Sequence, residues 1–302
     1  MFIGVFLALA GAFTHSVSFI TRKKGLEVAD YKLFILARVV IGLVFSVLLL
    51  WTVGPGLSGL TIKGAVPFVL TGGLAGGFIA LFTTTLAIHY IGAAKAHSIT
   101  SSSPLVTAAG EVIFLGAALT LQIILGTVFV VIGAALISFL IHRKERVEAA
   151  DNDEGSNRPL LGLAMASYTV LAIGSQMAMH KWGLDNGATP LQGLFLHVLT
   201  AAILFGLYFL LNNPNLELHK LSKFKYSGNF LIAAVAMAIL PLFSLYALTF
   251  LPATVVSALM RVAPLFTVVL THFFLKGIES VDWKIGLSTC LIVTGAVLVS
   301  LQ

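Results

Sequence analysis

Long apolar runs separated by short polar connections recur from one end of the chain to the other. Each run has the length of a helix that crosses the hydrocarbon core of a bilayer, which takes roughly 20 residues. The pattern predicts an all-α integral membrane protein. We expect ten transmembrane helices, at about 2–21, 31–53, 64–90, 94–116, 120–142, 159–181, 190–211, 230–250, 252–275 and 284–301.

Composition agrees with this pattern and argues against soluble classes of protein. The chain is 58% hydrophobic and 10% charged, with a mean hydropathy of +1.02, far from the values of soluble domains. Its connections are too short for a separate enzyme or nucleic-acid module. The single cysteine excludes an intrachain disulfide, and no Cys/His cluster has metal-ligand spacing. We therefore predict no cofactor, no metal and no nucleic-acid partner.

Basic residues predict how the chain is oriented. Of the 18 Lys and Arg residues, all but four fall in the connections that follow the odd-numbered helices. The opposite side carries only Lys63 and Lys181, and Arg38 and Arg261 lie inside helices. Under the positive-inside rule both termini are extracytoplasmic, in a multi-pass protein of the inner or plasma membrane. The segment at 2–21 lacks a preceding basic region and is expected to be a retained helix.

The chain also matches itself when it is shifted by 160 residues. Pro104 then lies on Pro264 and Gly126 on Gly286, and "GAALIS" at 133–138 recurs as "GAVLVS" at 295–300. We expect a first five-helix repeat at 1–142, a polar cytoplasmic linker at 143–158 and a second five-helix repeat at 159–302. An odd number of helices makes the repeats inverted, which is typical of transporters with a substrate path between their halves.

These features resemble the ten-helix, EamA-type members of the drug/metabolite transporter superfamily. The resemblance covers nearly the whole chain and rests on the duplication and on the tight connections "HYIGAAKA" and "FLPATVV". It also rests on the proline-containing helices "SSSPLVTAAGEVIFLG" and "RVAPLFTVVLTHFFLKG". It implies a transporter rather than an enzyme. The chain departs from the family at Ala117 and Gly277, where an acidic residue is common, and in the predicted side of its termini.

Arg261 is the leading candidate for a substrate-binding residue. It lies roughly 13 Å deep in the predicted helix 252–275, where a charge costs about 2.5–3.5 kcal/mol unless it faces a cavity or a partner. Ser257 lies on the same helix face as Arg261. The repeat counterpart of Arg261 is Ser101, in the polar run that begins at His97. Two hypotheses stay open: Arg261 binds an anionic group of the substrate, or it forms a structural ion pair with Glu111. Glu111 is also a candidate proton carrier, because burial favours a protonated carboxyl group.

Other polar residues have both a structural and a functional interpretation. Tyr168, Gln176 and Tyr246 are expected to line the same cavity. The scattered histidines, His180 and His197 among them, are individually more typical of packed or interfacial positions, and Arg38 is shallow enough to reach the interface. "TGGLAGGF" at 71–78 favours close helix packing, since it lacks the strand and lysine of a nucleotide-binding loop.

The sequence favours a secondary transporter for a small polar or amphipathic metabolite, with an amino acid as the leading example, working by alternating access. Two alternatives remain at this stage. The first is a transporter of organic phosphates or nucleotide sugars, and the second is an intramembrane enzyme or a channel. The expected partners are the small-molecule substrate and the lipid bilayer, and a homodimer is left open.

Overall fold

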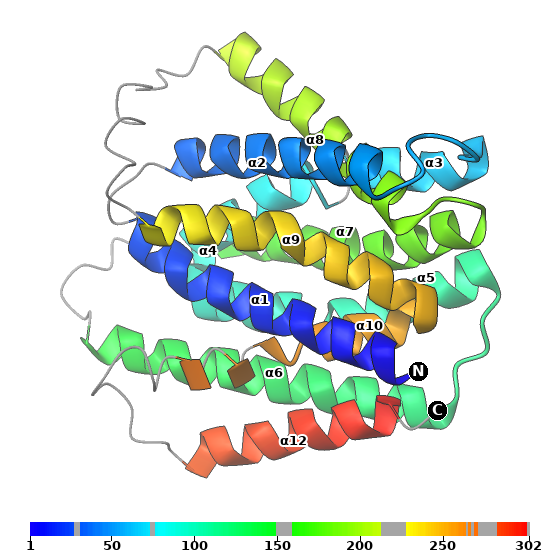
Figure 1. Ribbon diagram of the computed structural model, residues 1–302. Coiled ribbons are helices and arrows are strands. Elements are labelled where there is room, and N and C mark those ends of the chain that lie inside the picture. Colours follow the sequence, from blue (N-terminus) through cyan, green and yellow to red (C-terminus); the bar gives the residue numbers. More distant parts are fainter. Residues whose placement is uncertain are drawn as a thin grey trace.

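The computed structural model shows a bundle of long helices that lie side by side (Figure 1). It describes residues 1–26, 31–72, 76–148, 159–212, 228–263, 265–266, 269–270 and 283–300. The helices are α1 (Phe2–Leu26), α2 (Tyr31–Thr52), α3 (Ile62–Leu70), α4 (Ile79–Thr100), α5 (Ser103–Leu115), α6 (Leu121–Glu148), α7 (Pro159–Asp185), α8 (Pro190–Asn212), α9 (Gly228–Phe250), α10 (Ala253–Met260) and α12 (Trp283–Ser300). The described residues form no strand, which confirms the predicted all-helical class.

Four of the described helices are long and apolar enough to cross a membrane by themselves: they lie within α2, α7, α8 and α9. Shorter apolar helices include those within α1, α5, α6 and α12. The count of ten transmembrane helices therefore stays a prediction. It was wrong to expect the spans 64–90, 94–116 and 252–275 to be continuous, because each contains a break in the described helix.

Prolines explain the positions of two of these breaks. A proline ring clashes with the carbonyl group four residues before it. The residues four positions before Pro104 and Pro264 are Thr100 and Met260, which are the last residues of α4 and α10. The chain makes a turn at 101–102 and again at 261–262 before helical structure resumes. The two breaks therefore occupy equivalent places in the two predicted repeats.

The third break separates α3 from α4. Thr71 and Gly72 form a wide turn, and the Thr71 carbonyl oxygen accepts hydrogen bonds from the N–H groups of Gly76 (2.8 Å) and Gly77 (3.1 Å). Glycines lower the stability of a helix, so a glycine-rich segment is a natural place for it to open. The predicted close packing of this segment is present as well, because a Cβ at Gly72 would collide with the backbone of His197.

Contacts with α7 show that the chain passes that helix twice in opposite directions. Thr83 meets Thr169 (2.8 Å between the hydroxyl oxygens), and Ile91 lies beside Gly162 near the start of α7. Farther along, α5 follows α7 in parallel, since Val106 adjoins Gly174 and Gly110 adjoins Ala178. The chain therefore reverses between Ile91 and Ser103, near the predicted tight connection "HYIGAAKA".

The helix pairs also show the relative direction of the two halves. α1 runs parallel to α10, because Gly11 adjoins Met260 and Ser16 donates a hydrogen bond to the carbonyl of Ala263. α5 runs parallel to α7 and antiparallel to α10, as the contacts of the site below show. It follows that α1 and α7, the first helices of the two predicted repeats, point in opposite directions (Figure 1), as an inverted duplication requires.

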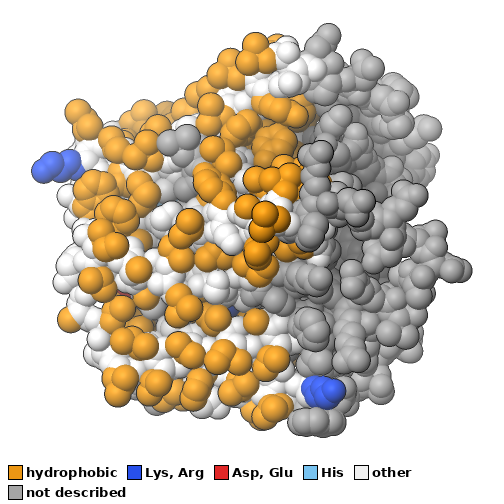
Figure 2. All heavy atoms as spheres, turned by 180° about the vertical axis from the view of Figure 1, so that it is seen from behind, with side chains coloured by type: hydrophobic (Ala, Val, Ile, Leu, Met, Phe, Trp, Pro, Cys, Tyr) orange, Lys and Arg blue, Asp and Glu red, His pale blue; other side chains and the backbone are white. Residues whose placement is uncertain are grey.

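Hydrophobic side chains cover much of the outer surface. In the described part of the face in Figure 2 they are spread over the whole surface, and Lys and Arg appear near its edges. Phe2, Ile113 and Leu171 are among the large apolar residues that are exposed. Such a surface is stable next to lipid tails, whereas a soluble monomer rarely exposes so large an apolar area.

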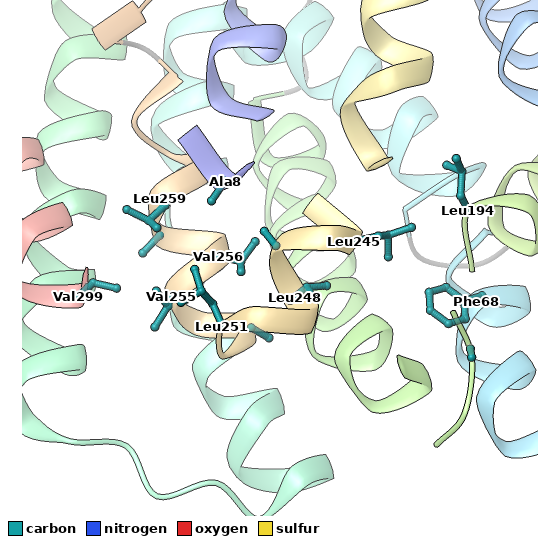
Figure 3. Packing of buried hydrophobic residues seen from close by; sticks show 14 residues of the cluster. Ala8, Phe68, Leu194, Leu245, Leu248, Leu251, Val255, Val256, Leu259 and Val299 are labelled. Atoms are coloured by element: carbon teal, nitrogen blue, oxygen red, sulfur yellow. The ribbon is translucent and has the colours of Figure 1, made fainter. Parts of the chain in front are cut away.

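The largest apolar cluster lies at the corner between α9 and α10 (Figure 3). Leu248 of α9, Leu251 directly after it, and Val255 and Leu259 of α10 are buried there. Ala8 of α1, Phe68 of α3, Leu194 of α8 and Val299 of α12 belong to the same cluster. This packing fixes α10 in the middle of the bundle, where it contacts elements of both halves.

The last helices of the two predicted repeats, α6 and α12, pack antiparallel through glycines. A Cβ added at Gly295 would lie 2.5 Å from the Gly126 carbonyl oxygen and 2.7 Å from the Val130 nitrogen. Both neighbours are backbone atoms, which cannot rotate away. Gly133 and Gly295, the first residues of the recurring "GAALIS" and "GAVLVS" segments, each pack closely on the other helix: Gly133 on Ser288 and Ile292, and Gly295 on Gly126 and Val130.

Gly295→Ala is expected to destabilise the protein by about 1–3 kcal/mol, the usual cost of overpacking. Gly206→Ala on α8 is the matched control, because no atom lies within 4 Å of its added Cβ. That substitution should be neutral or stabilising, since alanine is the better helix former. Thermal unfolding of the purified variants in detergent measures both. Equal stabilities of the two variants would contradict this account of the α6–α12 contact.

Candidate functional site between α5 and α10

Polar side chains meet at every turn along the contact between α5 and α10. Ser103, Thr107 and Glu111 project from α5, and their partners on α10 and its ends are Ala253 with Thr254, Ser257 and Arg261. Spacings of about four residues place each set on one face of its helix. We call these residues the polar ladder. Sequence numbers rise on one helix as they fall on the other, so the two helices are antiparallel.

Glu111 forms one end of the polar ladder. Its buried carboxylate accepts hydrogen bonds from the backbone N–H groups of Ala253 and Thr254 and from the Thr254 hydroxyl. The first N–H groups of a helix have no partner within that helix. Pro252, which precedes α10, provides no side-chain cap. The carboxylate fills this role, and its negative charge suits the positive end of the helix dipole.

In this position Glu111 does not form the ion pair with Arg261, which is one of the two hypotheses that the sequence leaves open. Glu111 contacts the first turn of α10, and Arg261 directly follows its last residue, Met260. Eight residues of helix put about 12 Å between the two ends. The sequence does not show that the carboxylate is used by the backbone groups at the start of α10.

Thr107 forms the middle of the ladder and joins three helices. Its hydroxyl oxygen lies 3.1 Å from the Ser257 hydroxyl oxygen on α10 and 3.1 Å from the Gly174 carbonyl oxygen on α7. Thr107 and Ser257 are both buried. A hydrogen-bonded pair of hydroxyl groups at this depth favours one alignment of α5 and α10, because a slip would leave the buried Ser257 hydroxyl without this partner.

Arg261 closes the ladder at the break after α10. Its Nη2 atom donates a hydrogen bond to the Ser103 hydroxyl, and the side chain is half-buried. A cation at this end of α10 is favourable, because the last carbonyl groups of a helix carry partial negative charge. Ser103 is two residues from Ser101, which is buried in the equivalent break of the first half. The guanidinium group therefore joins the two breaks.

The remaining predicted site residues lie elsewhere. The Gln176 side chain lies against Gly76, at the break between α3 and α4. Tyr246 of α9 packs against the apolar cluster of Leu50, Leu191 and Phe195. Tyr168 is exposed on α7, and the side chain of His97 lies outside the described part of the chain. The structure thus brings Arg261, Ser257 and Glu111 into one ladder, with Ser101 beside it, and gives the others separate surroundings.

Sequence reasoning missed Ser103, Thr107 and Thr254. A usable signal was present, because Ser103, Thr107 and Glu111 are spaced by four residues and share a helix face. Thr254 gave no such signal, since its role follows from the start of α10 at Ala253.

Comparison with known proteins agrees with this arrangement of two halves. The sequence model of the EamA-like transporter family matches residues 2–139 and again residues 160–301. The chain belongs to the EamA-like transporter family. Its members are integral membrane proteins that transport small solutes, and the two matched segments correspond to the two predicted repeats.

Solved structures share the fold of this EamA-like transporter. One crystal structure matches over 99% of this chain and 97% of its own chain, with a TM-score of 0.73 and 17% sequence identity. At that identity the likeness concerns the fold alone. No curated protein matches the sequence of this EamA-like transporter.

Glu111→Ala is expected to destabilise this EamA-like transporter by about 2–4 kcal/mol, because it leaves backbone N–H groups at the start of α10 without a partner. Glu111→Gln should cost less, since the amide oxygen still accepts. Asp185→Asn is the matched control: this exposed carboxylate only pairs with Lys181 at 2.7 Å, and such pairs contribute at most about 1 kcal/mol. Reversible unfolding in detergent measures the differences. A harmless Glu111→Ala would show that Glu111 does not hold α10.

Proposed function

We propose that the protein is a secondary transporter of a small polar or amphipathic metabolite that carries a carboxylate group, with an amino acid as the leading example. The observation that carries the proposal is the pairing of two helix breaks at equivalent places in the two halves, joined by a half-buried arginine. Interrupted helices that face each other between inverted repeats are the usual setting of transporter binding sites.

The breaks supply polar backbone groups where an uninterrupted helix would have none. Non-helical backbone within a membrane is stable only where neighbouring side chains or a cavity satisfy its N–H and C=O groups. Ser16 of α1 satisfies one of them, since it donates to the Ala263 carbonyl at 2.6 Å. A substrate with both donors and acceptors would find further partners in the same region.

Arg261 is proposed to bind the carboxylate of the substrate. Its described partner is the neutral hydroxyl of Ser103. The ion pair between Lys181 and Asp185 lies farther along α7, away from the ladder. An arginine whose charge is not neutralised by a carboxylate can offer paired donors to an anionic ligand.

Ser101 and Ser257 are proposed to give hydrogen bonds to the polar parts of the substrate. A role for His97, Gln176, Tyr168 and Tyr246 stays a prediction from the sequence. Glu111 contributes by holding the start of α10 in place. Alternating access would move the two halves about the polar ladder, so that the site opens first to one side and then to the other.

We further propose that both chain termini are extracytoplasmic. The marked ends of the chain lie on one side of the bundle, and α1, α6 and α8 end on the opposite side (Figure 1). Most Lys and Arg residues lie in the last turns of these three helices or in the segments that follow them. Basic connections of this kind stay in the cytoplasm.

Arg261→Ala is expected to abolish uptake, because it removes the charged donor. Arg261→Lys should retain a small part of the uptake, since a lysine keeps the positive charge but not the two parallel N–H donors of the guanidinium group. Exchange of radiolabelled L-amino acids by protein reconstituted in liposomes measures this, with exposed Lys63→Ala as the control for a lost positive charge. Unchanged exchange by a folded Arg261→Ala variant would remove Arg261 from the site.

The orientation is tested by cysteine labelling in a Cys290→Ser background. Ser58→Cys, in the connection between α2 and α3, should react with a membrane-impermeant maleimide added to whole cells, because residue 58 is exposed. Lys23→Cys and Lys223→Cys should react only after permeabilisation; position 223 lies outside the described residues. The reverse pattern of labelling would place the termini in the cytoplasm.

A further inference from the structure

A second buried polar cluster lies away from the polar ladder, at the break between α3 and α4. The Thr71 hydroxyl oxygen is 2.9 Å from Nε2 of His180 on α7 and 3.5 Å from Nδ1 of His197 on α8. The two imidazole rings meet edge to face, with 5.3 Å between their centroids, and all three side chains are buried. Phe68 stacks on His180 at 4.9 Å. The proposed transport function makes no use of this cluster.

The cluster is built into the broken helix. Thr71 is the residue at which α3 opens, and its own carbonyl accepts from Gly76 and Gly77 across the break. Gly72 packs so closely on α8 that a Cβ there would collide with the His197 carbonyl group. A change in the hydrogen bonds of either histidine therefore acts directly on the shape of this break.

Counting protons shows how the three side chains are connected. Thr71 has one hydroxyl proton, which it can donate to the Pro67 carbonyl at 2.8 Å. Its oxygen then has two lone pairs, which accept from Nε2–H of His180 and Nδ1–H of His197. The other nitrogen of each ring, Nδ1 of His180 and Nε2 of His197, forms no hydrogen bond to any group in the described part of the chain. Both nitrogens are then bases that can take up a proton.

The charges around the cluster limit how many protons it can hold. Burial of the two rings opposes a positive charge on them most, and Arg38 of α2, acting on His197, and His197, acting on His180, oppose it further. From the other packed elements, α3 brings only the exposed Lys63, and α7 brings the mutually paired Lys181 and Asp185. The described residues of α9 carry no charge. With Arg38 close by and the two rings in contact, a second proton would be strongly opposed.

We propose that His180 and His197, bridged by Thr71, form a proton-binding site that takes up a single proton per protein from water. The proton binds to a ring nitrogen, and the pair changes from neutral to singly positive. No other group needs to be oxidised, reduced or transferred.

Proton binding would change the break between α3 and α4. A protonated imidazole has two N–H donors and needs a second acceptor. The Gln176 side chain is one helical turn before His180 and lies against Gly76, at the same break. Loading the proton therefore favours a state in which this segment or Gln176 turns an oxygen towards the pair. If the proposed transport function holds, this is where a proton gradient would drive the transporter.

The site is tested by NMR of the full chain in lipid nanodiscs, with 15N-labelled histidine rings and a pH titration. His180→Gln and His197→Gln assign the two ring signals among the eight histidines of the chain. We expect the two rings to titrate together in the wild type, with uptake of one proton between them, and each single variant to change the titration of the remaining ring. Rings that stay neutral throughout, or that each take up a full proton independently, would overturn the proposal.

Thr71→Val tests the bridge, because it keeps the shape of the side chain and removes the hydroxyl. It should separate the two titrations, and Thr71→Ser should restore them. His15→Gln on α1 is the control, and should leave both signals unchanged. Each variant is checked for folding by size exclusion and thermal unfolding, and if Thr71→Val does not fold, the wild-type titration still decides the proposal. Because no substrate is used, failure here is distinguishable from failure of the Arg261 transport test.

Discussion

The structure depends on satisfying backbone polar groups at the start of a helix that lies buried in the middle of the bundle. Glu111 does this for α10, since its carboxylate accepts from two N–H groups and a hydroxyl at once. In water these groups would find solvent, but an apolar environment offers no replacement, and each unpaired group costs free energy. A charged residue is therefore stable at this depth because it meets the positive end of a helix dipole.

The same constraint explains why the two halves meet through polar side chains. The helices α4 and α10 end at equivalent places, at Thr100 and at Met260, and each interruption leaves backbone groups that need partners. Ser103, Thr107 and Ser257 supply hydroxyl groups between the interrupted helices, and Ser16 reaches the carbonyl of Ala263. A hydrogen bond between two hydroxyl groups contributes little net free energy to folding. Such a bond can therefore be exchanged for a bond to a substrate at small cost.

Hydropathy predicted the uninterrupted helices closely and the interrupted ones poorly. The expected spans 31–53 and 190–211 differ by one residue from α2 and α8, because both are continuous apolar runs. A break does not change hydropathy, so 64–90 and 252–275 looked like single helices although their glycines and prolines were visible. The partner of Glu111 could not be deduced, because position along a helix gives depth but not direction. His180 and His197 are 17 residues apart on different helices, so only the fold brings them to Thr71.

The helix α7 connects the two polar clusters. Its Gly174 carbonyl contacts Thr107 in the ladder, and His180 contacts Thr71 at the other break. Six residues of helix separate these contacts, about 9 Å. A continuous helix of this length moves as one body, so a shift of α7 that alters one set of hydrogen bonds also alters the other. Coupling between two sites requires an element with two discrete positions, and the state of each site must change the balance between those positions. α7 is suited to that role, because Thr107 lies in the second turn of α5, which begins at one break, and Thr71 lies at the other break, directly after α3.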